Sequence, residues 1–188
     1  MRVIAGTARR LLLKTLPGDE TRPTTDQIKE TLFNMIHFDL PGARFMDLYA
    51  GSGAIGIEAL SRGAACALFV DNNPKAAAVI RDNLEHTHFT DRSQVITADA
   101  VSALRRLERD RSAEPYDIIF MDPPYGQGLE DEALRILADS PLANGNTCFI
   151  IEMRIDADTE HFEQLGYEPE KLKEYRSNKH VFLKRRKE

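Results

Sequence analysis

Apolar and polar positions alternate regularly along the chain from residue 44 onward. Apolar runs of strand length follow one another, and each is separated from the next by a segment whose apolar residues recur at helical spacing. Runs of valine, isoleucine and phenylalanine with few polar interruptions are typical of parallel strands buried on both faces. The pattern predicts an α/β fold with strands at 44–49, 67–71, 94–98, 116–122 and 147–153 and helices at 55–61, 74–86, 100–109 and 129–139.

The last part of the chain breaks this alternation. Two runs, 171–175 and 180–183, flank the segment Arg176-Ser177-Asn178-Lys179, which has the composition of a turn. Two short strands joined in this way form an antiparallel hairpin. We therefore expect a mostly parallel sheet that ends in an antiparallel hairpin, with His180 at a strand edge or against a bound partner.

The first forty residues predict a helix preceded by irregular chain. Thr24 and Gln27 match a capping box, and apolar residues recur at helical spacing from 28 to 36. Pro41-Gly42 ends this part before the first strand of the sheet. The runs 3–4 and 11–13 are candidates for a small hairpin.

Composition indicates a soluble protein with one catalytic unit. The chain has 188 residues, of which 42% are hydrophobic and 29% charged. It has no apolar run of membrane-spanning length, and its start lacks the pattern of a secretory signal, so we expect a cytoplasmic protein. Cys66 and Cys148 lie far apart in apolar runs, so we expect buried structural thiols. His86 and His88 lack the spacing of a metal site and are expected at the surface.

The net charge of -5 is unevenly distributed along the chain. A negative protein is a poor partner for nucleic acid, because binding to phosphates relies on lysine and arginine. Basic residues nevertheless concentrate at the two ends of this chain and leave the acidic surplus to its middle. These residues are Arg2, Arg9, Arg10, Lys14 and Arg22 near the start, and Lys171, Lys173, Arg176, Lys179, Lys184, Arg185, Arg186 and Lys187 near the end.

A glycine-rich loop follows the first strand of the predicted sheet. The segment from Asp47 to Gly56 reads DLYAGSGAIG, a strand that enters a turn and opens a helix. Glycine permits positive φ and lets a ligand approach the backbone closely. Gly51, Gly53 and Gly56 also satisfy the dinucleotide fingerprint, and Asp71 stands where a carboxylate binds ribose hydroxyls. The loop alone therefore does not exclude a nicotinamide cofactor.

Asp47 and the later tetrapeptide Asp122-Pro123-Pro124-Tyr125 favour S-adenosylmethionine as the cofactor. Asp47 places a carboxylate where the cationic methionine portion of this cofactor would lie, whereas a dinucleotide brings an anionic pyrophosphate. Asp99, followed by Ala100, is a candidate acceptor for the adenine amine, although an aspartate there is also a natural helix cap. The predicted cofactor-binding residues are Asp47, Gly51, Ser52, Gly53, Asp71, Asn72, Asp99 and Ala100.

The tetrapeptide Asp122-Pro123-Pro124-Tyr125 ends the strand predicted at 116–122. The carboxyl edge of an open α/β sheet is where ligands bind. An exocyclic amine on a base is a poor nucleophile, because its lone pair is delocalised into the ring. Asp122 and the carbonyl of Pro123 could accept both amine hydrogens and aim the lone pair at a methyl donor. Two prolines hold these acceptors rigid, and Tyr125 offers a face for stacking, worth roughly 1 to 3 kcal/mol per base. We expect Asp122, Pro123 and Tyr125 to be catalytic.

With these motifs the chain resembles the RsmD family of bacterial 16S ribosomal RNA guanine-N2 methyltransferases. The resemblance covers nearly the whole chain and rests on Thr21-Arg22-Pro23-Thr24-Thr25-Asp26, Lys29-Glu30-Thr31-Leu32-Phe33-Asn34, Asp47-Leu48-Tyr49-Ala50-Gly51-Ser52-Gly53, Gly56-Ile57-Glu58-Ala59-Leu60-Ser61-Arg62-Gly63 and the tetrapeptide. The chain departs from the family pattern near both ends, at Thr7-Ala8-Arg9-Arg10-Leu11 and at Ser177-Asn178-Lys179-His180.

The resemblance implies a seven-stranded, Rossmann-like, mostly parallel sheet with a C-terminal antiparallel hairpin. It implies S-adenosylmethionine as methyl donor and a guanine of the small ribosomal subunit as acceptor, with no metal. Residues 1–40 would form an RNA-facing extension of a catalytic domain at 41–188, in a protein that we expect to be a monomer. The implied RNA-facing residues are Arg9, Arg10, Arg22, Thr24, Asp26 and Pro124.

Two other functions share part of this pattern. A DNA adenine-N6 or cytosine-N4 methyltransferase would use the same tetrapeptide, but such enzymes generally carry an added segment that reads the target sequence. A non-catalytic RNA-binding or assembly factor could keep the fold, but it would not need Asp47, Gly51, Asp71 and Asp122 together.

Overall fold

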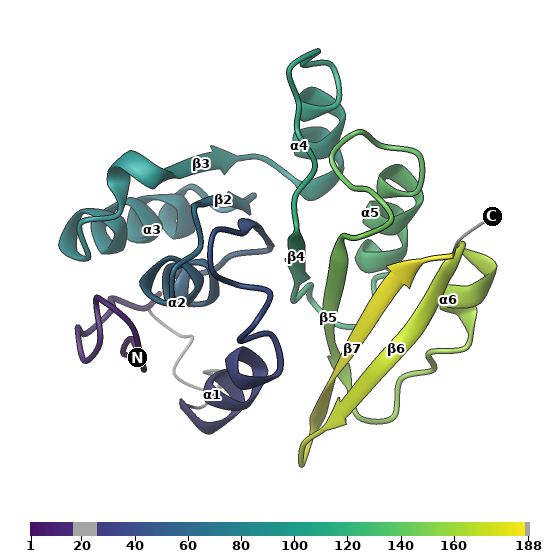
Figure 1. Ribbon diagram of the computed structural model, residues 1–188, viewed down its shortest axis with the longest axis horizontal. Helices are drawn as coiled ribbons and strands as arrows, with labels where there is room; N and C mark the ends of the chain where they lie inside the picture. The colour runs from purple at the N-terminus through teal and green to yellow at the C-terminus, as the bar shows by residue number, and fades with distance from the viewer. Residues whose placement is uncertain (17–25, 187–188) are drawn as a thin grey trace. The chain divides into compact units, whose positions relative to one another are not determined.

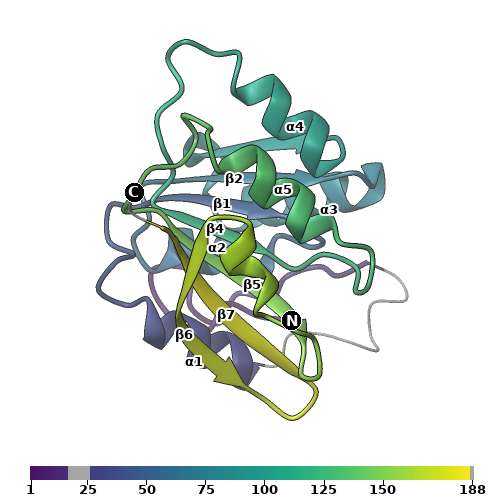
Figure 2. The same cartoon turned by 90° about the vertical axis from the view of Figure 1, so that its right-hand side faces the viewer.

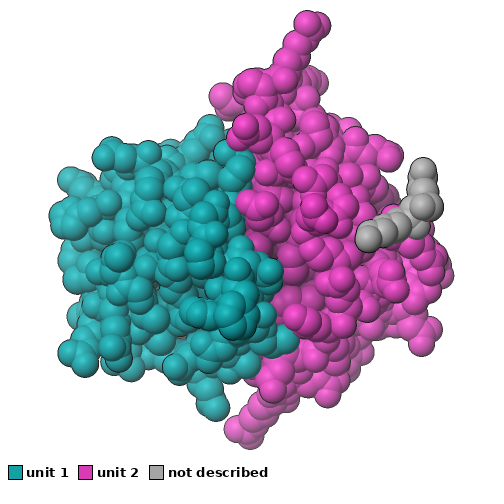
Figure 3. All heavy atoms as spheres, in the orientation of Figure 1, with its two compact units in different colours: residues 1–99 teal, residues 100–188 magenta. Residues whose placement is uncertain are grey.

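The predicted alternation of strands and helices is present in a computed structural model of the chain, which describes residues 1–16 and 26–186. The chain divides into two compact units, residues 1–99 and residues 100–188 (Figure 3). Unit 1 contributes three strands and unit 2 contributes four. The predicted fold class, an α/β fold with a mostly parallel seven-stranded sheet, is confirmed. Among the described residues, no helix combines the length and apolar character needed to cross a membrane.

Unit 1 is built on three parallel strands in the order β3-β2-β1, of which β3 and β2 are labelled in Figure 1. Nearly every side chain of β1 and β2 is buried, because parallel strands are covered on both faces. All the predicted elements of this unit are found within one or two residues of their expected bounds. They are α1 (Asp26–Met35), β1 (Arg44–Leu48), α2 (Ala54–Ser61), β2 (Cys66–Asp71), α3 (Pro74–His86) and β3 (Ser93–Thr97); the short helix η2 (Thr90–Arg92) was not predicted.

The N-terminal segment is fixed to helix α2. Its two arms pair as expected, with an antiparallel bridge between Arg2 and Leu12. Gly6 (φ +82°) lies so close to the helix that a Cβ atom there would come within 1.8 Å of the Ser61 carbonyl oxygen. A glycine is therefore required at this position for steric reasons.

A buried ion cluster holds the same segment in place. The Glu58 carboxylate accepts hydrogen bonds from the backbone N–H groups of Ile4 (2.8 Å) and Ala5 (2.9 Å) and from Arg62 Nε (2.8 Å). Its Oε2 lies 3.2 Å from Lys29 Nζ on α1, and both of these side chains are fully buried. Burial lowers the pKa of Lys29, opposed by the charge of Glu58. Two backbone donors and two cations thus satisfy one buried carboxylate.

Unit 2 contains a mixed sheet of four strands in the order β4-β5-β7-β6. β4 and β5 are parallel, whereas β7 is antiparallel to both of its neighbours. Helices α4 and α5 lie side by side in this unit (Figure 2), and α6 lies next to β6 (Figure 1). The elements are α4 (Ala100–Leu107), β4 (Ile118–Met121), α5 (Leu129–Leu137), β5 (Cys148–Arg154), α6 (His161–Gln164), β6 (Tyr167–Glu174) and β7 (Asn178–Arg185).

Some expectations were wrong in detail. The hairpin strands begin or end several residues beyond the predicted runs, so Asn178 and Lys179 belong to β7 and not to the turn. His180 is fully buried between paired strands, not at an edge. Cys66 and Cys148 carry reduced thiols, but each is only partly buried and not fully buried as expected. His86 and His88 are exposed as predicted.

Candidate active site

The glycine-rich loop of unit 1 makes a tight turn directly after β1. Three of its residues have positive φ, namely Tyr49 (66°), Gly51 (56°) and Gly53 (78°). The turn is closed by a hydrogen bond from Gly53 N–H to the Ala50 carbonyl (2.7 Å). A Cβ atom added at Gly51 would meet no described atom within 4 Å, so open space lies in front of this backbone. The loop can therefore admit a ligand close to the main chain.

Asp71, at the end of β2, lies against this loop. Its Oδ2 accepts a hydrogen bond from Gly51 N–H (2.8 Å) and its Oδ1 accepts one from Asn73 N–H (2.8 Å). Asn73 in turn caps helix α3 by accepting from Lys75 N–H (2.9 Å). The carboxylate is only partly buried and is fixed in position by two backbone donors.

Asp47 lies beneath the loop, with 2% of its surface exposed. Its Oδ2 accepts a hydrogen bond from Gly56 N–H (2.9 Å) in the first turn of α2, where backbone donors have no partner within the helix. Burial raises the pKa of Asp47 to about 7, helped by the charge of Asp71 and opposed by the bond from Gly56. A carboxyl group of this kind changes its charge near neutral pH.

Asn83 on α3 supports the loop and was missed by the sequence interpretation. Its Nδ2 donates to the carbonyls of Ser52 (2.9 Å) and Lys14 (3.0 Å), and its Oδ1 accepts from Lys14 N–H (2.8 Å). The side chain is buried. The available signal was its place on the apolar face of the helix, between Ile80 and Leu84, where an unpaired amide would be costly.

The tetrapeptide follows β4 in unit 2, as predicted. Asp122 and Tyr125 are half-buried, Pro123 is buried and Pro124 is exposed. The residues after it, Gly126 and Gly128, have positive φ and lead into α5. The segment therefore lies in a loop at the carboxyl end of a parallel strand, where α/β folds bind ligands.

A cavity of about 280 Å³ adjoins the tetrapeptide. It lies wholly in unit 2 and is lined by Pro123, Tyr125, Gly126, Glu130, Glu152, Met153, Arg154, Asp156 and Ala157. Arg154 is bound to Asp156 by two hydrogen bonds, of 3.0 and 2.8 Å, so its charge is largely compensated. The cavity thus combines an aromatic ring with an excess of carboxylate groups.

Glu152 is a second residue of this region that the sequence interpretation missed. It is 5% exposed, and its carboxylate accepts from Asn178 Nδ2 (2.6 Å, to Oε1) and contacts His180 Nε2 (3.1 Å, to Oε2). The other ring nitrogen of His180 lies 3.1 Å from the Tyr175 hydroxyl. Burial, together with the charge of Glu152, raises the pKa of Tyr175 to about 12. An acidic residue inside the apolar run of β5 was the signal in the sequence.

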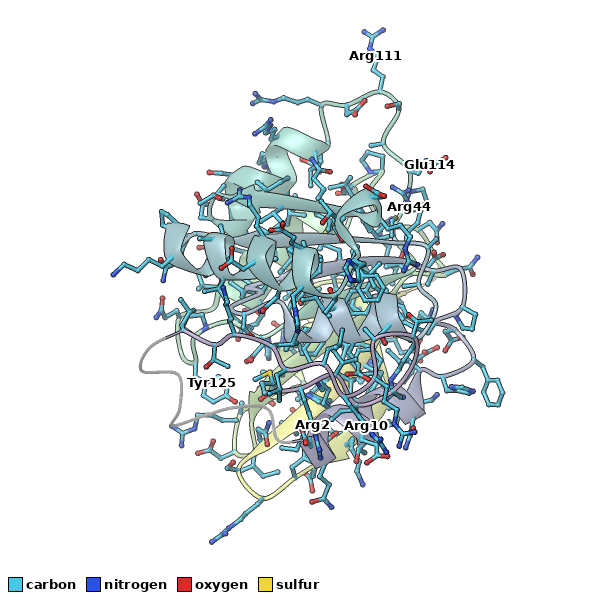
Figure 4. The ribbon with its side chains drawn as sticks, turned by 90° about the vertical axis from the view of Figure 1, so that its left-hand side faces the viewer. Arg2, Arg10, Arg44, Arg111, Glu114 and Tyr125 are labelled. Carbon is cyan, nitrogen blue, oxygen red and sulfur yellow. The ribbon has the colours of Figure 1, made fainter. Side chains whose placement is uncertain are left out.

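The remaining predicted residues lie at several places. Ser52 is partly buried in the loop, Asn72 and Asp99 are exposed, and Ala100 is the first residue of α4. Arg9 and Arg10 are exposed, and the second of them has a positive φ of 73°. Figure 4 shows the side chains of Arg2 and Arg10, which come from the two paired arms of the N-terminal segment.

Asp26 already has a partner, because Arg2 Nε donates to its Oδ2 over 2.8 Å. The pair is exposed, so it contributes little to stability. Arg22 and Thr24, including the capping box predicted with Thr24, lie outside the described residues.

Comparisons with known proteins identify relatives of the chain. A family model described as conserved hypothetical protein 95 matches residues 1–183. YlbH from Bacillus subtilis, named as an rRNA methyltransferase, is 45% identical over 125 residues, which are 66% of this chain and 67% of that protein. Ribosomal RNA small subunit methyltransferase D from Escherichia coli is 33% identical over 158 residues, which are 83% of this chain and 76% of that protein. Among solved structures, yhhF from Escherichia coli, named as a methyltransferase, has a TM-score of 0.82 and 28% identity, covering 100% of this chain and 99% of that chain.

Proposed function

The chain belongs to the RsmD family, and from this premise we propose that it transfers a methyl group from S-adenosylmethionine to the exocyclic N2 of a guanine in 16S ribosomal RNA of the small ribosomal subunit. The observation that carries the proposal is the tetrapeptide at the end of β4, next to a cavity of about 280 Å³. The relatives named above as ribosomal RNA methyltransferases support the choice of RNA as substrate.

The loop of unit 1 fits the cofactor. When bound, S-adenosylmethionine supplies an electrophilic methyl group on a sulfonium centre. The open space at Gly51 admits it close to the backbone, and Asp47 offers a carboxylate that ionises near neutral pH. We assign the ribose to Asp71 and the adenine amine to Asp99. The neighbouring backbone and side chains of Ser52, Gly53, Asn72 and Ala100 complete the proposed binding residues.

The residues of unit 2 hold and orient the acceptor base. Asp122 and the Pro123 carbonyl accept the two hydrogens of the guanine N2 amine, so that the nitrogen can become tetrahedral and its lone pair is no longer delocalised into the ring. Tyr125 stacks on the base, and the two prolines keep both acceptors in fixed positions. After transfer the nitrogen loses a proton, for which Asp122 is the nearest proposed acceptor. The rate enhancement comes mainly from aligning the amine nitrogen with the methyl group of the cofactor.

The basic N-terminal segment is the proposed RNA contact. Arg9 and Arg10 are exposed, and their charge can displace counterions from phosphates. We also propose that four further residues contact the RNA where it enters the site, namely Arg22, Thr24, Asp26 and Pro124. The enzyme would act as a monomer in the cytoplasm, where small ribosomal subunits assemble.

The test is transfer of labelled methyl groups in three parallel reactions, with unmodified small subunits, naked 16S ribosomal RNA and DNA. We expect N2-methylguanine in RNA, identified by mass spectrometry of the digested product. Labelling of DNA alone would favour the adenine-N6 or cytosine-N4 alternative. Cofactor binding without transfer to any substrate would favour a non-catalytic assembly factor.

A further inference from the structure

The tetrapeptide does not by itself select a base, because adenine, cytosine and guanine all carry an exocyclic amine. What differs is the ring position beside that amine. Adenine N1 and cytosine N3 are acceptors, whereas guanine N1 carries a hydrogen and is a donor. A group that reads this position therefore separates guanine from the other two bases, and it must be an acceptor.

The cavity next to Tyr125 contains such an acceptor. Its volume equals that of about nine water molecules, enough for a single nucleobase. It is lined by Glu130 and Glu152, while its arginine, Arg154, is already paired with Asp156. A site with this charge suits a hydrogen-bond donor and disfavours phosphate.

Glu152 is the better positioned of the two carboxylates. It is 5% exposed and is held by Asn178 and His180, both on β7, the strand paired with β5. Glu130 lies in the first turn of α5 and is more exposed, and its Oε2 has no hydrogen-bond partner among the described residues. A side chain fixed by two donors from a paired strand is preorganised for recognition.

The contacts of Glu152 leave capacity for a ligand. Because a carboxylate only accepts, the hydrogen between Glu152 and His180 belongs to His180 Nε2. Tyr175, whose pKa is raised to about 12, keeps its hydroxyl hydrogen and donates to Nδ1. Each oxygen of Glu152 then accepts one hydrogen bond from the protein and retains a lone pair for another.

We propose that Glu152 determines base specificity by accepting the N1–H of the target guanine, while the N2 amine is bound by Asp122 and Pro123. Adenine or cytosine would instead bring a lone pair against the carboxylate, and this contact is repulsive. His180 and Asn178 act as positioning residues. The inference rests on the proposed function and adds to it the reason why guanine is the accepted base.

The test changes the target guanine in one experiment and Glu152 in another. The guanine that the enzyme labels is first located by mass spectrometry, and an RNA is then assembled with 2,6-diaminopurine at that position. This base keeps the 2-amino group but has an acceptor at N1. We expect the native enzyme to methylate the guanine RNA at least about 10-fold faster, as kcat/KM, than the diaminopurine RNA.

The Glu152→Gln variant should lose most of this preference. A neutral glutamine amide accepts the guanine N1–H more weakly than a carboxylate does, and its NH2 group can donate to the N1 lone pair of diaminopurine. The ratio of the two rates should therefore fall by about 10-fold or more. Glu168→Gln is the matched control, an exposed glutamate on β6 of the same unit. Cofactor affinity, measured by calorimetry, should be unchanged in both variants, because neither Glu152 nor Glu168 is a proposed cofactor residue.

Each outcome decides the question. If a folded Glu152→Gln variant prefers the guanine RNA over the diaminopurine RNA as strongly as the native enzyme does, the inference is overturned. The same holds if this preference is lost in Glu130→Gln but not in Glu152→Gln. If Glu152→Gln does not fold, the native enzyme still provides a test, since equal rates on the two RNAs would overturn the assignment. Failure of the native enzyme to label any guanine in RNA would instead refute the proposed function itself.

Discussion

The buried carboxyl group of Asp47 makes the stability of unit 1 depend on pH in an unusual direction. Its pKa is raised from the ordinary 3.8 to about 7, so between these values the folded chain retains a proton that the unfolded chain releases. Stability therefore falls as the pH rises through this window, and it is fully retained only below it. Paired carboxylates, whose pKa values are lowered, have the opposite effect.

The two pKa values give the size of the effect. Integrating proton release from pH 5 to pH 8 yields a loss of about 2 to 3 kcal/mol in the free energy of unfolding from this one group. In the Asp47→Asn variant the amide oxygen can still accept from Gly56 N–H, but the side chain no longer titrates. We therefore expect the variant to gain about 2 to 3 kcal/mol relative to the native chain between these two pH values.

Urea unfolding followed by circular dichroism at pH 5, 6, 7 and 8 measures this difference. Comparison with the native chain at each pH cancels the titration of all other groups. The Asp91→Asn variant, which changes an exposed carboxylate, controls for the loss of one negative charge. If the stabilities of the native chain and Asp47→Asn run parallel across the range, the reasoning about burial is wrong.

The same ionisation predicts how cofactor affinity varies with pH. If the cationic methionine portion of S-adenosylmethionine meets ionised Asp47, the Kd should fall about 10-fold between pH 6 and pH 8, because the carboxylate fraction rises around a pKa of about 7. Calorimetry on the native chain and on Asp47→Asn measures this dependence, which the variant should lack. A flat profile for the native chain would show that the charge of Asp47 does not reach the cofactor.

Three further predictions concern other parts of the molecule. Asp122→Ala should lower the rate of methyl transfer from labelled cofactor by about 100-fold or more, because the amine nitrogen is no longer held in line with the methyl group. Calorimetry should show that the cofactor affinity of this variant is largely unchanged. Replacing Arg9 and Arg10 by glutamine should weaken RNA binding. The slope of the logarithm of the binding constant against the logarithm of the salt concentration should become shallower by about one unit for each arginine. An unchanged slope would show that these residues do not contact the RNA. Gly6→Ala should lower stability to urea by about 1 to 3 kcal/mol more than Gly42→Ala, because both glycines have positive φ but only the first is pressed against a backbone carbonyl. Equal losses would contradict the steric argument.

Much of the fold could be predicted because its signals are local. The strands and helices of unit 1 follow from the apolar runs, and the loop after β1 follows from its glycines. The position of Asp71 against this loop also follows, because adjacent parallel strands end at the same edge of the sheet.

The contacts that complete the site depend on residues far apart in the sequence. Glu152 gains its partners from Asn178 and His180, 26 and 28 positions later, and this pairing depends on the register between β5 and β7. The attachment of the N-terminal segment to Glu58 bridges more than fifty positions. Residue type and spacing do not encode such pairings, which arise only when the elements pack.

The order of strands in unit 2 also constrains how this unit folds. β6 precedes β7 in the chain, yet β7 lies between β5 and β6, so β6 cannot join the sheet before β7 is present. The two later strands can form a hairpin within microseconds, and the hairpin can then dock on β5 through β7. Glu152 receives its hydrogen-bond donors only in this docking step. Its carboxylate can therefore remain hydrated in the partly folded chain and lose water only when its partners arrive.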